Sequence, residues 1–456
     1  MQPVLTVTEM QAVDARAQAD TPLEQLVERA GTAVAGAALE LMGGAYGRRA
    51  VLVCGKGNNG ADGRVAARLL AGRGVRVTVV APGEVDAIGM SGPPVDLVVD
   101  AAFGTGFRGA YDAPRVAPGI PVLAVDIPSG VEGDTGRATG TVLPATATVT
   151  FVALKPGLVQ GDGATLAGEV RVVDIGLPVG SHRVDVVDDG DVADLVPARD
   201  PGGNKWVAAV LVVAGSPGMT GAATLSARAA YRAGAGMVRL GVPGGDPDDL
   251  PADEAVGIAL PAVGWADAAL AAAGRCHAVV VGPGLGRADE VGAEVQALVA
   301  SSPVPVVVDA DGLFALGRLD GPVAARSPVV LTPHDGEYAR LGDGPPGPDR
   351  IDAARRLAAA SGLVALVKGP TTAVADPSGR VLLARSGTPS LATAGTGDVL
   401  SGVIGALLAR GVPPLEAAAL GAHLHGRAGA LGHRSGLVAG DLPDLVARVL
   451  DAARRT

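Results

Sequence analysis

The stretch AVLVCGKGNNGADGRVAARLLAGRG, residues 50–74, decides the fold class of the first half of the chain. A β-branched run, a glycine-rich turn and an Ala/Leu-rich run closed by glycine predict strand, loop and helix. Similar strand-like runs recur along the whole chain, at residues 75–80, 96–100, 121–126, 208–216, 277–284, 303–311 and 363–369. Because these runs are apolar rather than alternating, they are typical of parallel strands covered on both faces. We therefore expect an α/β fold.

The length and composition predict more than one domain. The chain has 456 residues, of which 48% are hydrophobic and 18% charged, so it can build large cores and is unlike a disordered protein. A polar stretch rich in Asp, Gly and Pro, residues 175–206, interrupts the alternation of strands and helices. We place a boundary there, which gives domains at residues 1–182 and 183–456.

Charge and cysteine usage exclude several classes of protein. The net charge is −10 and aromatic residues make up 2%, which argues against a nucleic-acid-binding face. Cys54 and Cys276 cannot form a disulfide framework, have no zinc-ligand spacing near them and are expected in the core. The N-terminus does not resemble a secretory signal, and no apolar run approaches the roughly 20 residues that span a bilayer. We expect a cytoplasmic protein with no membrane partner.

The glycine-rich turn of residues 55–60 formally satisfies GxGxxG, a weak signal for a dinucleotide fold. The next strand ends in Ala81 without an acid to hold a ribose, and the turn lacks the Lys-Ser/Thr of a phosphate-binding Walker loop. It carries instead Asn58, Asn59 and Asp62, each of which turn chemistry or a helix start could explain.

Polar side chains follow two further strands of the first half. Asp100, Asp126 and Ser129 lie at predicted strand ends, where ligands bind in parallel sheets. We expect them to converge with Asn59 on one rim. Oxygen atoms from Asn, Asp and Ser suit a hard cation, although each residue alone could be a turn or cap.

The motifs GKGNNGADGRVAARLL, DAAFGTG, AVDIPSG and TFVALKPGL, with the opening VLTVTEMQAVDARA, resemble the Rossmann-like N-terminal domain of NAD(P)H-hydrate repair enzymes, which is similar to NAD(P)H-hydrate epimerases. The resemblance implies a K⁺ ion held by Asn59, Asp100 and Ser129, and proton transfer by Asp126. It implies contacts with the hydrated nucleotide from a larger set: Asn58, Asn59, Gly60, Ala61, Asp62, Gly104, Thr105, Gly106, Phe107, Arg108, Gly109, Ala110 and Asp126.

The first half departs from this family in two places. Ala61 replaces a glycine of the usual NNGGDG loop, and only residues 81–95 separate two predicted parallel strands. A parallel crossover needs about a dozen residues and is usually a helix. We expect the usual helices to be trimmed or absent, which thins the wall of the first site.

The second half also places polar side chains after its strands: Asp309, Asp311, His334, Glu337 and Lys368. Taken singly, they have structural explanations. His334 could be a turn histidine, Lys368 a solvated strand end, and the two aspartates could cap a helix.

The segment LATAGTGDVLSGVIGALLARG, residues 391–411, predicts an anion site at a helix start, because Gly395 and Gly397 allow close approach to free N–H groups. Asp398 could simply complement the helix dipole, worth about 0.3–1 kcal/mol. If a phosphate binds there, however, the Asp398 carboxylate lies next to another negative charge. Two such charges about 4 Å apart repel by several kcal/mol at an effective dielectric near 20. A general base that takes a proton during phosphoryl transfer offsets that cost, as in small-molecule hydroxyl kinases.

GSPGMTGAA, GPGLGR, TPHDGEYARL, KGPTT, LATAGTGDVLSG and LEAAALGAHLHGRAG together resemble the ribokinase-like domain of ADP-dependent NAD(P)H-hydrate dehydratases, over most of residues 184–456. The resemblance implies that hydrated NADH or NADPH is dehydrated at the expense of ADP, with Mg²⁺, giving AMP and phosphate. Asp398 would activate the ring hydroxyl. The adenine nucleotide would contact Lys368, Gly369, Pro370, Thr371, Thr372, Gly395, Thr396 and Gly397. The hydrate would contact Ala222, Gly284, His334 and Asp398.

The sequence Asn204-Lys205-Trp206 stands where this family more often has His-Lys-Gly, and we expect Trp206 to narrow that entrance. His423 and His425 are expected to be structural. Together the two halves predict a bifunctional repair enzyme, expected as a homo-oligomer. The alternatives are an ATP-dependent hydroxyl kinase of the ribokinase-like class and a first domain that is only a non-catalytic module. Preference for ADP or ATP, and for NADH or NADPH hydrate, stays open.

Overall fold

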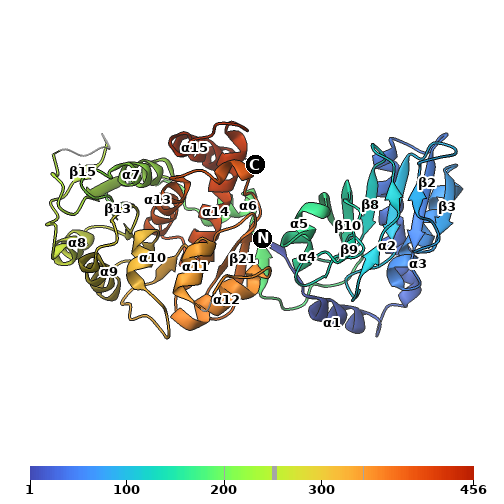
Figure 1. The fold of residues 1–456 in the computed structure, drawn as a ribbon, viewed down its shortest axis with the longest axis horizontal. Helices are drawn as coiled ribbons and strands as arrows, with labels where there is room; N and C mark the ends of the chain where they lie inside the picture. Colours follow the sequence, from blue (N-terminus) through green and yellow to red (C-terminus); the bar gives the residue numbers. More distant parts are fainter. Residues whose placement is uncertain (200, 249–253, 343, 456) are drawn as a thin grey trace. The chain divides into compact units, whose positions relative to one another are not determined.

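The computed structural model describes residues 1–199, 201–248, 254–342 and 344–455. It divides into two compact units, residues 2–182 and residues 183–456 together with Met1. Each unit is an α/β structure built on a largely parallel sheet (Figure 1). None of the described helices is long and apolar enough to cross a membrane.

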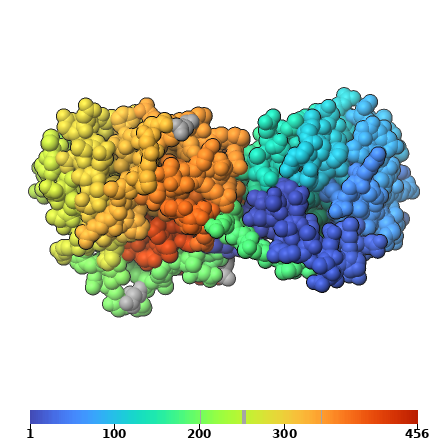
Figure 2. Space-filling view, turned by 90° about the horizontal axis from the view of Figure 1, so that it is seen from below, coloured from blue at the N-terminus to red at the C-terminus, as the bar shows by residue number. Residues whose placement is uncertain are grey.

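The first unit is built on a six-stranded parallel sheet. The strand order is β11 (Glu169–Val173), β10 (Ala147–Phe151), β8 (Val122–Val125), β5 (Leu97–Ala101), β2 (Arg49–Cys54) and β3 (Arg76–Val80). Its helices are α1 (Val7–Ala17), α2 (Leu23–Met42), α3 (Asn58–Gly72), α4 (Pro156–Val159) and α5 (Gly163–Leu166), and the short strands are β1 (Gln2–Pro3), β4 (Ala87–Ile88), β6 (Tyr111–Asp112), β7 (Arg115–Val116) and β9 (Gly140–Thr141). The dark-blue N-terminal helices reach the surface of this unit (Figure 2).

The two faces of the first sheet are covered differently. Helices α2 and α3 pack on one face, where Leu97 and Val99 of β5 are fully buried. The other face is covered by loops, since the described residues on either side of β5, 81–96 and 102–121, contain only the short strands β4, β6 and β7 and no helix. The expectation of absent crossover helices is therefore confirmed. The two edge strands are exceptions to two-sided burial: Val79 of β3 is 45% exposed, and no residue of β11 is fully buried.

Three of the chain's few aromatic residues cover the face that lacks helices. The ring of Phe103 lies 4.5 Å from that of Phe107 and 5.1 Å from that of Tyr111, centre to centre. Edge-on and tilted contacts between aromatic rings stabilise the packing beyond the effect of burying their apolar surface. Compact aromatic packing thus replaces the usual helix layer and holds the loop after β5 in place.

The second unit is built on a larger sheet, in which β20 runs antiparallel to both its neighbours. The order is β12 (Val184–Val186), β21 (Val381–Ala384), β20 (Thr372–Ala375), β19 (Val364–Val367), β18 (Val329–Leu331), β17 (Val306–Val308), β16 (Ala278–Val281), β13 (Ala209–Val213), β14 (Met237–Gly241) and β15 (Val256–Gly257). Its helices are α6 (Asp189–Leu195), α7 (Gly221–Arg232), α8 (Trp265–Ala273), α9 (Asp289–Ser301), α10 (Asp311–Leu316), α11 (Asp335–Leu341), α12 (Arg350–Ser361), α13 (Thr396–Ala409), α14 (Pro414–Leu431) and α15 (Leu442–Ala453).

Helix α13 lies at the centre of the second unit. All but two of its residues are buried, and it packs between the sheet and α7 and α14. Gly402 makes the approach to α7 possible, since a Cβ atom there would lie 2.2 Å from the Ser226 carbonyl oxygen. His423 and His425 of α14 are both buried, and His423 Nε2 lies 2.8 Å from Asp189. Cys54 and Cys276 are free and buried, as expected.

We predict that Gly402→Ala destabilises the second unit by about 1–3 kcal/mol, because the added methyl group forces α13 and α7 apart. Gly292→Ala in α9 is the matched control, since a Cβ atom there meets only an ordinary contact at 3.8 Å. The free energy of unfolding of the control should rise by about 0.5–1 kcal/mol, because alanine has a higher helix propensity than glycine. Denaturant unfolding measures both, and equal effects of the two substitutions would contradict this account of α13.

Candidate functional site

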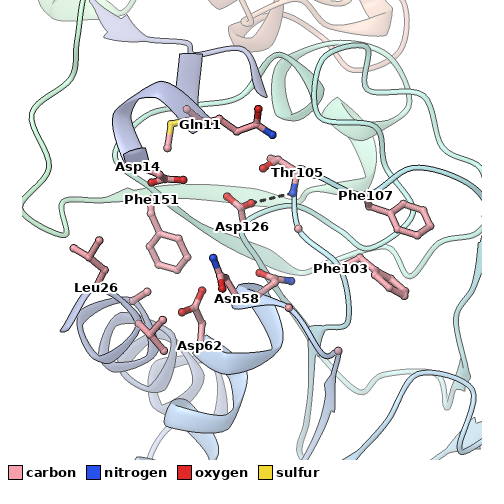
Figure 3. Close-up of a pocket in the computed structure, with 18 of the residues that line it drawn as sticks. Gln11, Asp14, Leu26, Asn58, Asp62, Phe103, Thr105, Phe107, Asp126 and Phe151 are labelled. Atoms are coloured by element: carbon pink, nitrogen blue, oxygen red, sulfur yellow. Dashed lines mark hydrogen bonds between the residues drawn. The ribbon is translucent and has the colours of Figure 1, made fainter. Parts of the chain in front are cut away.

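The first unit contains a cavity of about 720 Å³ at the carboxyl ends of its strands (Figure 3). The lining comes from α1, α2, the turn that begins α3, the loop after β5 and the end of β8. Asp100 is paired with Ala124 in the parallel register, so the β5 and β8 loops leave the sheet at the same edge. The predicted convergence of strand-end residues is therefore confirmed, because it follows from parallel strands in register.

Asp126 lies at the centre of this cavity in a left-handed conformation, with φ of 67°. One carboxylate oxygen accepts from the Thr105 N–H at 3.1 Å, and the other lies 2.8 Å from Lys155 Nζ. Burial by itself raises the pKa of Asp126, but Lys155 and the Thr105 hydrogen bonds outweigh it, so the pKa lies below its ordinary value. Asp126 is thus held ionised, ready to accept a proton.

Lys155 lies within the TFVALKPGL motif, but the sequence alone indicates no role for it. Its side chain is almost fully buried, and Nζ also donates to Thr150 Oγ1 at 2.6 Å and to the Phe151 carbonyl at 3.0 Å. A lysine inside an apolar run is the available signal, because an amine is rarely buried without a partner. Lys155 fixes both the position and the charge of Asp126.

Asp100 and Ser129 form a buried polar centre beneath the same edge. Ser129 donates its hydroxyl to one Asp100 oxygen at 2.6 Å and its N–H to the other at 2.8 Å. Burial raises the pKa of Asp100, and the Ser129 bonds only partly oppose it. The amide of Asn59 is buried with neither side-chain atom hydrogen-bonded. A buried carboxylate and an unsatisfied amide oxygen are the donors that a bound cation satisfies.

The structure separates the predicted hydrate-contacting residues of the first unit into two sets. Those that line the cavity are Asn58, Asn59, Asp62, Gly104, Thr105, Gly106, Phe107 and Asp126. Those that do not line it are Gly60, Ala61, Arg108, Gly109 and Ala110. Gly60 has a packing role instead, since a Cβ atom there would lie 1.9 Å from the Gly55 carbonyl oxygen. The lining also includes Gln11, Asp14 and Lys56, which the sequence gave no reason to single out.

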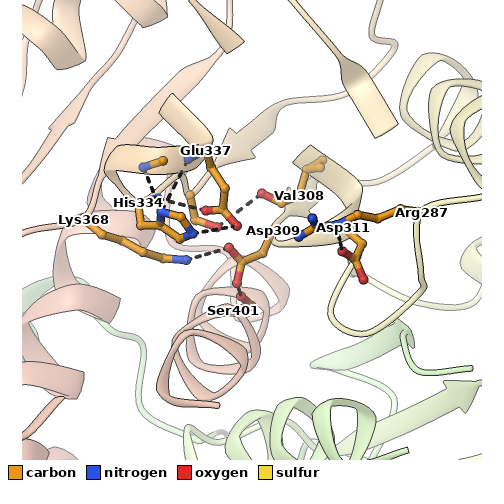
Figure 4. A network of polar contacts seen from close by, with 10 residues as sticks. Arg287, Val308, Asp309, Asp311, His334, Glu337, Lys368 and Ser401 are labelled. Carbon is orange, nitrogen blue, oxygen red and sulfur yellow. Dashed lines mark hydrogen bonds and ion pairs between the residues drawn. The ribbon is translucent and has the colours of Figure 1, made fainter. Parts of the chain in front are cut away.

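The second unit brings its predicted residues together around Asp309, at the carboxyl end of β17 (Figure 4). Lys368 Nζ lies 2.6 Å from one Asp309 oxygen, and the Ser401 hydroxyl donates to the other at 2.6 Å. Lys368 is therefore not a solvated strand end. Asp309 is nearly fully buried and spans from β17 to α13, so it fixes the ammonium group beside that helix.

Asp398 occupies the first turn of α13, three residues after the left-handed N-cap Gly395. Its pKa is raised to about 6 by burial and by the charge of Asp309, against the opposing effect of Lys368. Asp398 is therefore mostly ionised at neutral pH and is a stronger base than an ordinary aspartate.

Glycines shape the space around Asp398. A Cβ atom on Gly397 would lie 3.3 Å from Lys368 Nζ, so the helix start and the ammonium group face each other closely. Gly284 and Ala222, both expected to contact the hydrate, are neighbours: a Cβ atom on Gly284 would lie 3.1 Å from that of Ala222. The Thr396 hydroxyl is used locally, donating to the Leu391 carbonyl at 2.8 Å.

His334 caps α11. Its ring Nδ1 accepts from the Gly336 N–H at 3.0 Å, and its backbone N–H donates to the Glu337 carboxylate at 2.9 Å. The imidazole is largely exposed, with Nε2 3.4 Å from Glu337. Burial raises the pKa of Glu337, with a further contribution from Asp309. The turn-histidine interpretation is correct for the cap, and the exposed ring stays available to a ligand.

Arg350 holds the predicted nucleotide-binding turn of residues 368–372. Its Nη1 donates to the Lys368 carbonyl at 2.8 Å and pairs with Asp335 at 2.7 Å. Sequence reasoning missed Arg350, because it comes from α12 and no strand-end pattern marks it.

The expectation for Trp206 is wrong. Residues 204–206 precede β13 and therefore lie at the amino edge of the sheet, whereas Asp309 and Lys368 follow their strands at the carboxyl edge. Trp206 stacks under Arg275, with 4.2 Å from the guanidinium carbon to the ring centre. It thus stabilises the surface of the far edge and does not narrow the entrance.

Comparisons with known proteins agree with this arrangement. Residues 210–451 match the family model described as NAD(P)H-hydrate dehydratase. Residues 23–87 and 80–157 match the model described as YjeF-related protein N-terminus.

Curated relatives match both units. The bifunctional NAD(P)H-hydrate repair enzyme Nnr of Salinibacter ruber is 37% identical, over 98% of this chain and 96% of its own. That of Mycobacterium tuberculosis H37Rv is 42% identical over 83% and 82%. The solved ADP/ATP-dependent NAD(P)H-hydrate dehydratase of Bacillus subtilis, co-crystallised with ATP and Mg²⁺, is 28% identical with a TM-score of 0.50, covering 58% of this chain and 97% of its own. The chain therefore belongs to the family of bifunctional NAD(P)H-hydrate repair enzymes.

Proposed function

We propose that this chain repairs NADH and NADPH that have been hydrated on the nicotinamide ring. The second unit dehydrates the 6S epimer at the expense of ADP, giving AMP and phosphate, and the first unit interconverts the 6R and 6S epimers. The observation that carries the proposal is Asp398, a base of raised pKa at a helix start that faces the Lys368–Asp309 pair. The family relationship supports both activities.

In the dehydratase site, Asp398 removes the proton from the ring hydroxyl while that oxygen attacks the terminal phosphorus of ADP. AMP leaves, and the free N–H groups of α13 with Lys368 stabilise charge on the transferred group. The phosphorylated oxygen then departs as phosphate, and loss of a proton from the neighbouring carbon re-forms the ring double bond. Phosphorylation thus converts a poor leaving group into a good one.

The remaining predicted residues have defined places in this proposal. The turn of residues 368–372, held by Arg350, and the segment of residues 395–397 contact the adenine nucleotide. Ala222, Gly284 and the exposed ring of His334 contact the hydrate. Among the described residues no group of three or more His, Cys, Asp and Glu side chains could hold a metal ion. Mg²⁺ would therefore be bound mainly through nucleotide phosphates and water.

In the first unit, Asp126 takes part in proton transfer at the hydrated ring, within the cavity of about 720 Å³. Asn59, Asp100 and Ser129 would hold K⁺ beneath it, because a buried carboxylate and an unsatisfied amide oxygen are both present there. When bound, the ion compensates the buried charge of Asp100. Bound there, the ion would also hold the loops that carry Asn59 and Ser129.

We predict that Asp398→Asn lowers dehydratase turnover by at least about 100-fold, the usual contribution of a general base, while nucleotide affinity stays within a few-fold. Asp267→Asn is the matched control, since Asp267 lies in the first turn of α8 and is exposed. NADH absorbance reports turnover, and nucleotide titration reports binding. Because the base must be ionised, wild-type turnover should rise with pH through about pH 6. Near-normal turnover of Asp398→Asn would contradict the base role.

A second prediction concerns K⁺. The thermal unfolding temperature of the wild type should rise in KCl relative to tetramethylammonium chloride of equal ionic strength, because an ion that binds only the folded state stabilises it. Asp100→Asn should lose most of that difference, since it removes the charge that attracts the ion. Differential scanning calorimetry measures both without any assay of activity. Equal shifts in the two proteins would exclude a K⁺ site at Asp100.

A further inference from the structure

Three carboxylates face the cavity of the first unit, and the mechanism so far uses only Asp126. Asp14 of α1 and Asp62 of α3 also line this cavity, and Figure 3 shows all three carboxyl groups turned toward a common space. Asp62 is only 7% exposed. The complete set of charged residues that line the cavity is Asp14, Lys56, Asp62, Asp126 and Lys155.

Asp126 and Asp62 have very different partners. Asp126 has the ammonium group of Lys155 at 2.8 Å and the Thr105 N–H. The carboxyl group of Asp62 forms no hydrogen bond or ion pair with any described residue of the chain, and Lys56 is exposed. A buried carboxyl group without a cation or N–H donor, with like charges near it, avoids ionisation and keeps its proton.

The proposed epimerisation needs one proton donor and one acceptor. The hydrate carries its hydroxyl group on the carbon next to the ring nitrogen, so inversion requires the carbon–oxygen bond to break and to re-form on the other face. A hydroxyl group leaves readily only when it is protonated, and an incoming water adds readily only when it loses a proton. Two carboxyl groups whose environments push their pKa values apart fit these two tasks.

We propose that Asp62 is the general acid of the epimerase site, with Asp126 as its complementary base and Asp14 as a positioning residue that keeps Asp62 protonated. The inference rests on the proposed epimerase function and adds a second catalytic group to it. Nothing in the fold of α3 requires an acid at this buried position, four residues after the helix begins at Asn58.

The proton of the Asp62 carboxyl moves to the ring hydroxyl, the carbon–oxygen bond breaks, and water leaves while the nitrogen lone pair forms a carbon–nitrogen double bond. A water molecule then adds to the opposite face, forming the new carbon–oxygen bond and giving a proton to Asp126. Transfer of that proton back to Asp62 through water in the cavity restores both groups.

The electrostatics of the cavity support this division of roles. The pKa of Asp62 is raised to about 8 by burial, with further contributions from the charges of Asp126 and Asp14. Burial also raises the pKa of Asp14, and the charge of Lys155 opposes that rise. At neutral pH the cavity thus holds a protonated Asp62 beside an ionised Asp126.

The test follows epimer interconversion by the full chain without nucleotide, so that the dehydratase is silent, after subtraction of the spontaneous rate. Asp62→Asn should lower kcat at least about 100-fold with KM changed only a few-fold, because the amide fills the same space but cannot protonate the hydroxyl. Its dehydratase activity, measured separately with ADP on the 6S epimer, should be unchanged and serves as the folding control. Substantial residual kcat in Asp62→Asn would overturn the acid role while leaving the proposed function intact.

The pH profile separates a catalytic role from a structural one. Wild-type kcat should fall as pH rises through about 8, since Asp62 loses its proton there. Asp14→Asn removes a like charge, so it should lower the pKa of Asp62 and move this alkaline limb to lower pH. An unmoved limb in Asp14→Asn would exclude its positioning role. A wild-type chain that shows no interconversion above background would overturn the epimerase function and this inference together.

Discussion

Burial of carboxylates at the carboxyl edge of a parallel sheet is the constraint on which both sites depend. In the second unit, one Asp309 oxygen pairs with Lys368 and the other accepts a hydrogen bond from Ser401. These contacts fix a positive charge opposite the start of α13. Asp398 forms no ion pair with a described residue, so burial and the charge of Asp309, against the opposing effect of Lys368, leave it with a pKa of about 6. The same low-dielectric surroundings that make ionisation costly raise the proton affinity of Asp398, as the proposed base role requires.

In the first unit, too, one buried carboxylate is paired with a lysine and another is not, but here the unpaired one keeps its proton. Lys155 keeps Asp126 ionised, whereas Asp62, without a partner among the described residues, is driven toward the protonated form. Aromatic packing around Phe103 holds together the loops that cover the helix-free face of the sheet, and Phe103 and Phe107 also line the cavity. Shortened crossovers therefore remove helices without removing the residues that form the site.

The alternation of strands and helices, the absent crossover helices and the convergence of Asn59, Asp100 and Ser129 could all be predicted from the sequence, because they follow from local patterns and parallel-sheet geometry. Asp14 and Arg350 could not, since each contributes through a contact with a distant segment that no local pattern marks. For Lys155 the surrounding apolar run indicates burial, but no local pattern identifies Asp126 as its partner. The prediction for Trp206 was wrong because the sequence of a motif does not show at which edge of the sheet the motif lies. The split between protonated Asp62 and ionised Asp126 also depends on three-dimensional burial.

The fate of the hydroxyl oxygen tests the central claim most directly. The 6S epimer of hydrated NADH, prepared with ¹⁸O in its ring hydroxyl, is incubated with ADP and the Asp126→Asn variant, so that epimerisation in the first unit does not exchange the labelled oxygen with water. The inorganic phosphate released should carry the label, because the oxygen bonds to phosphorus before it leaves. Mass spectrometry of the phosphate measures this in a single turnover. Label found in water, with unlabelled phosphate, would show that the hydroxyl leaves without being phosphorylated and would contradict the role given to Asp398.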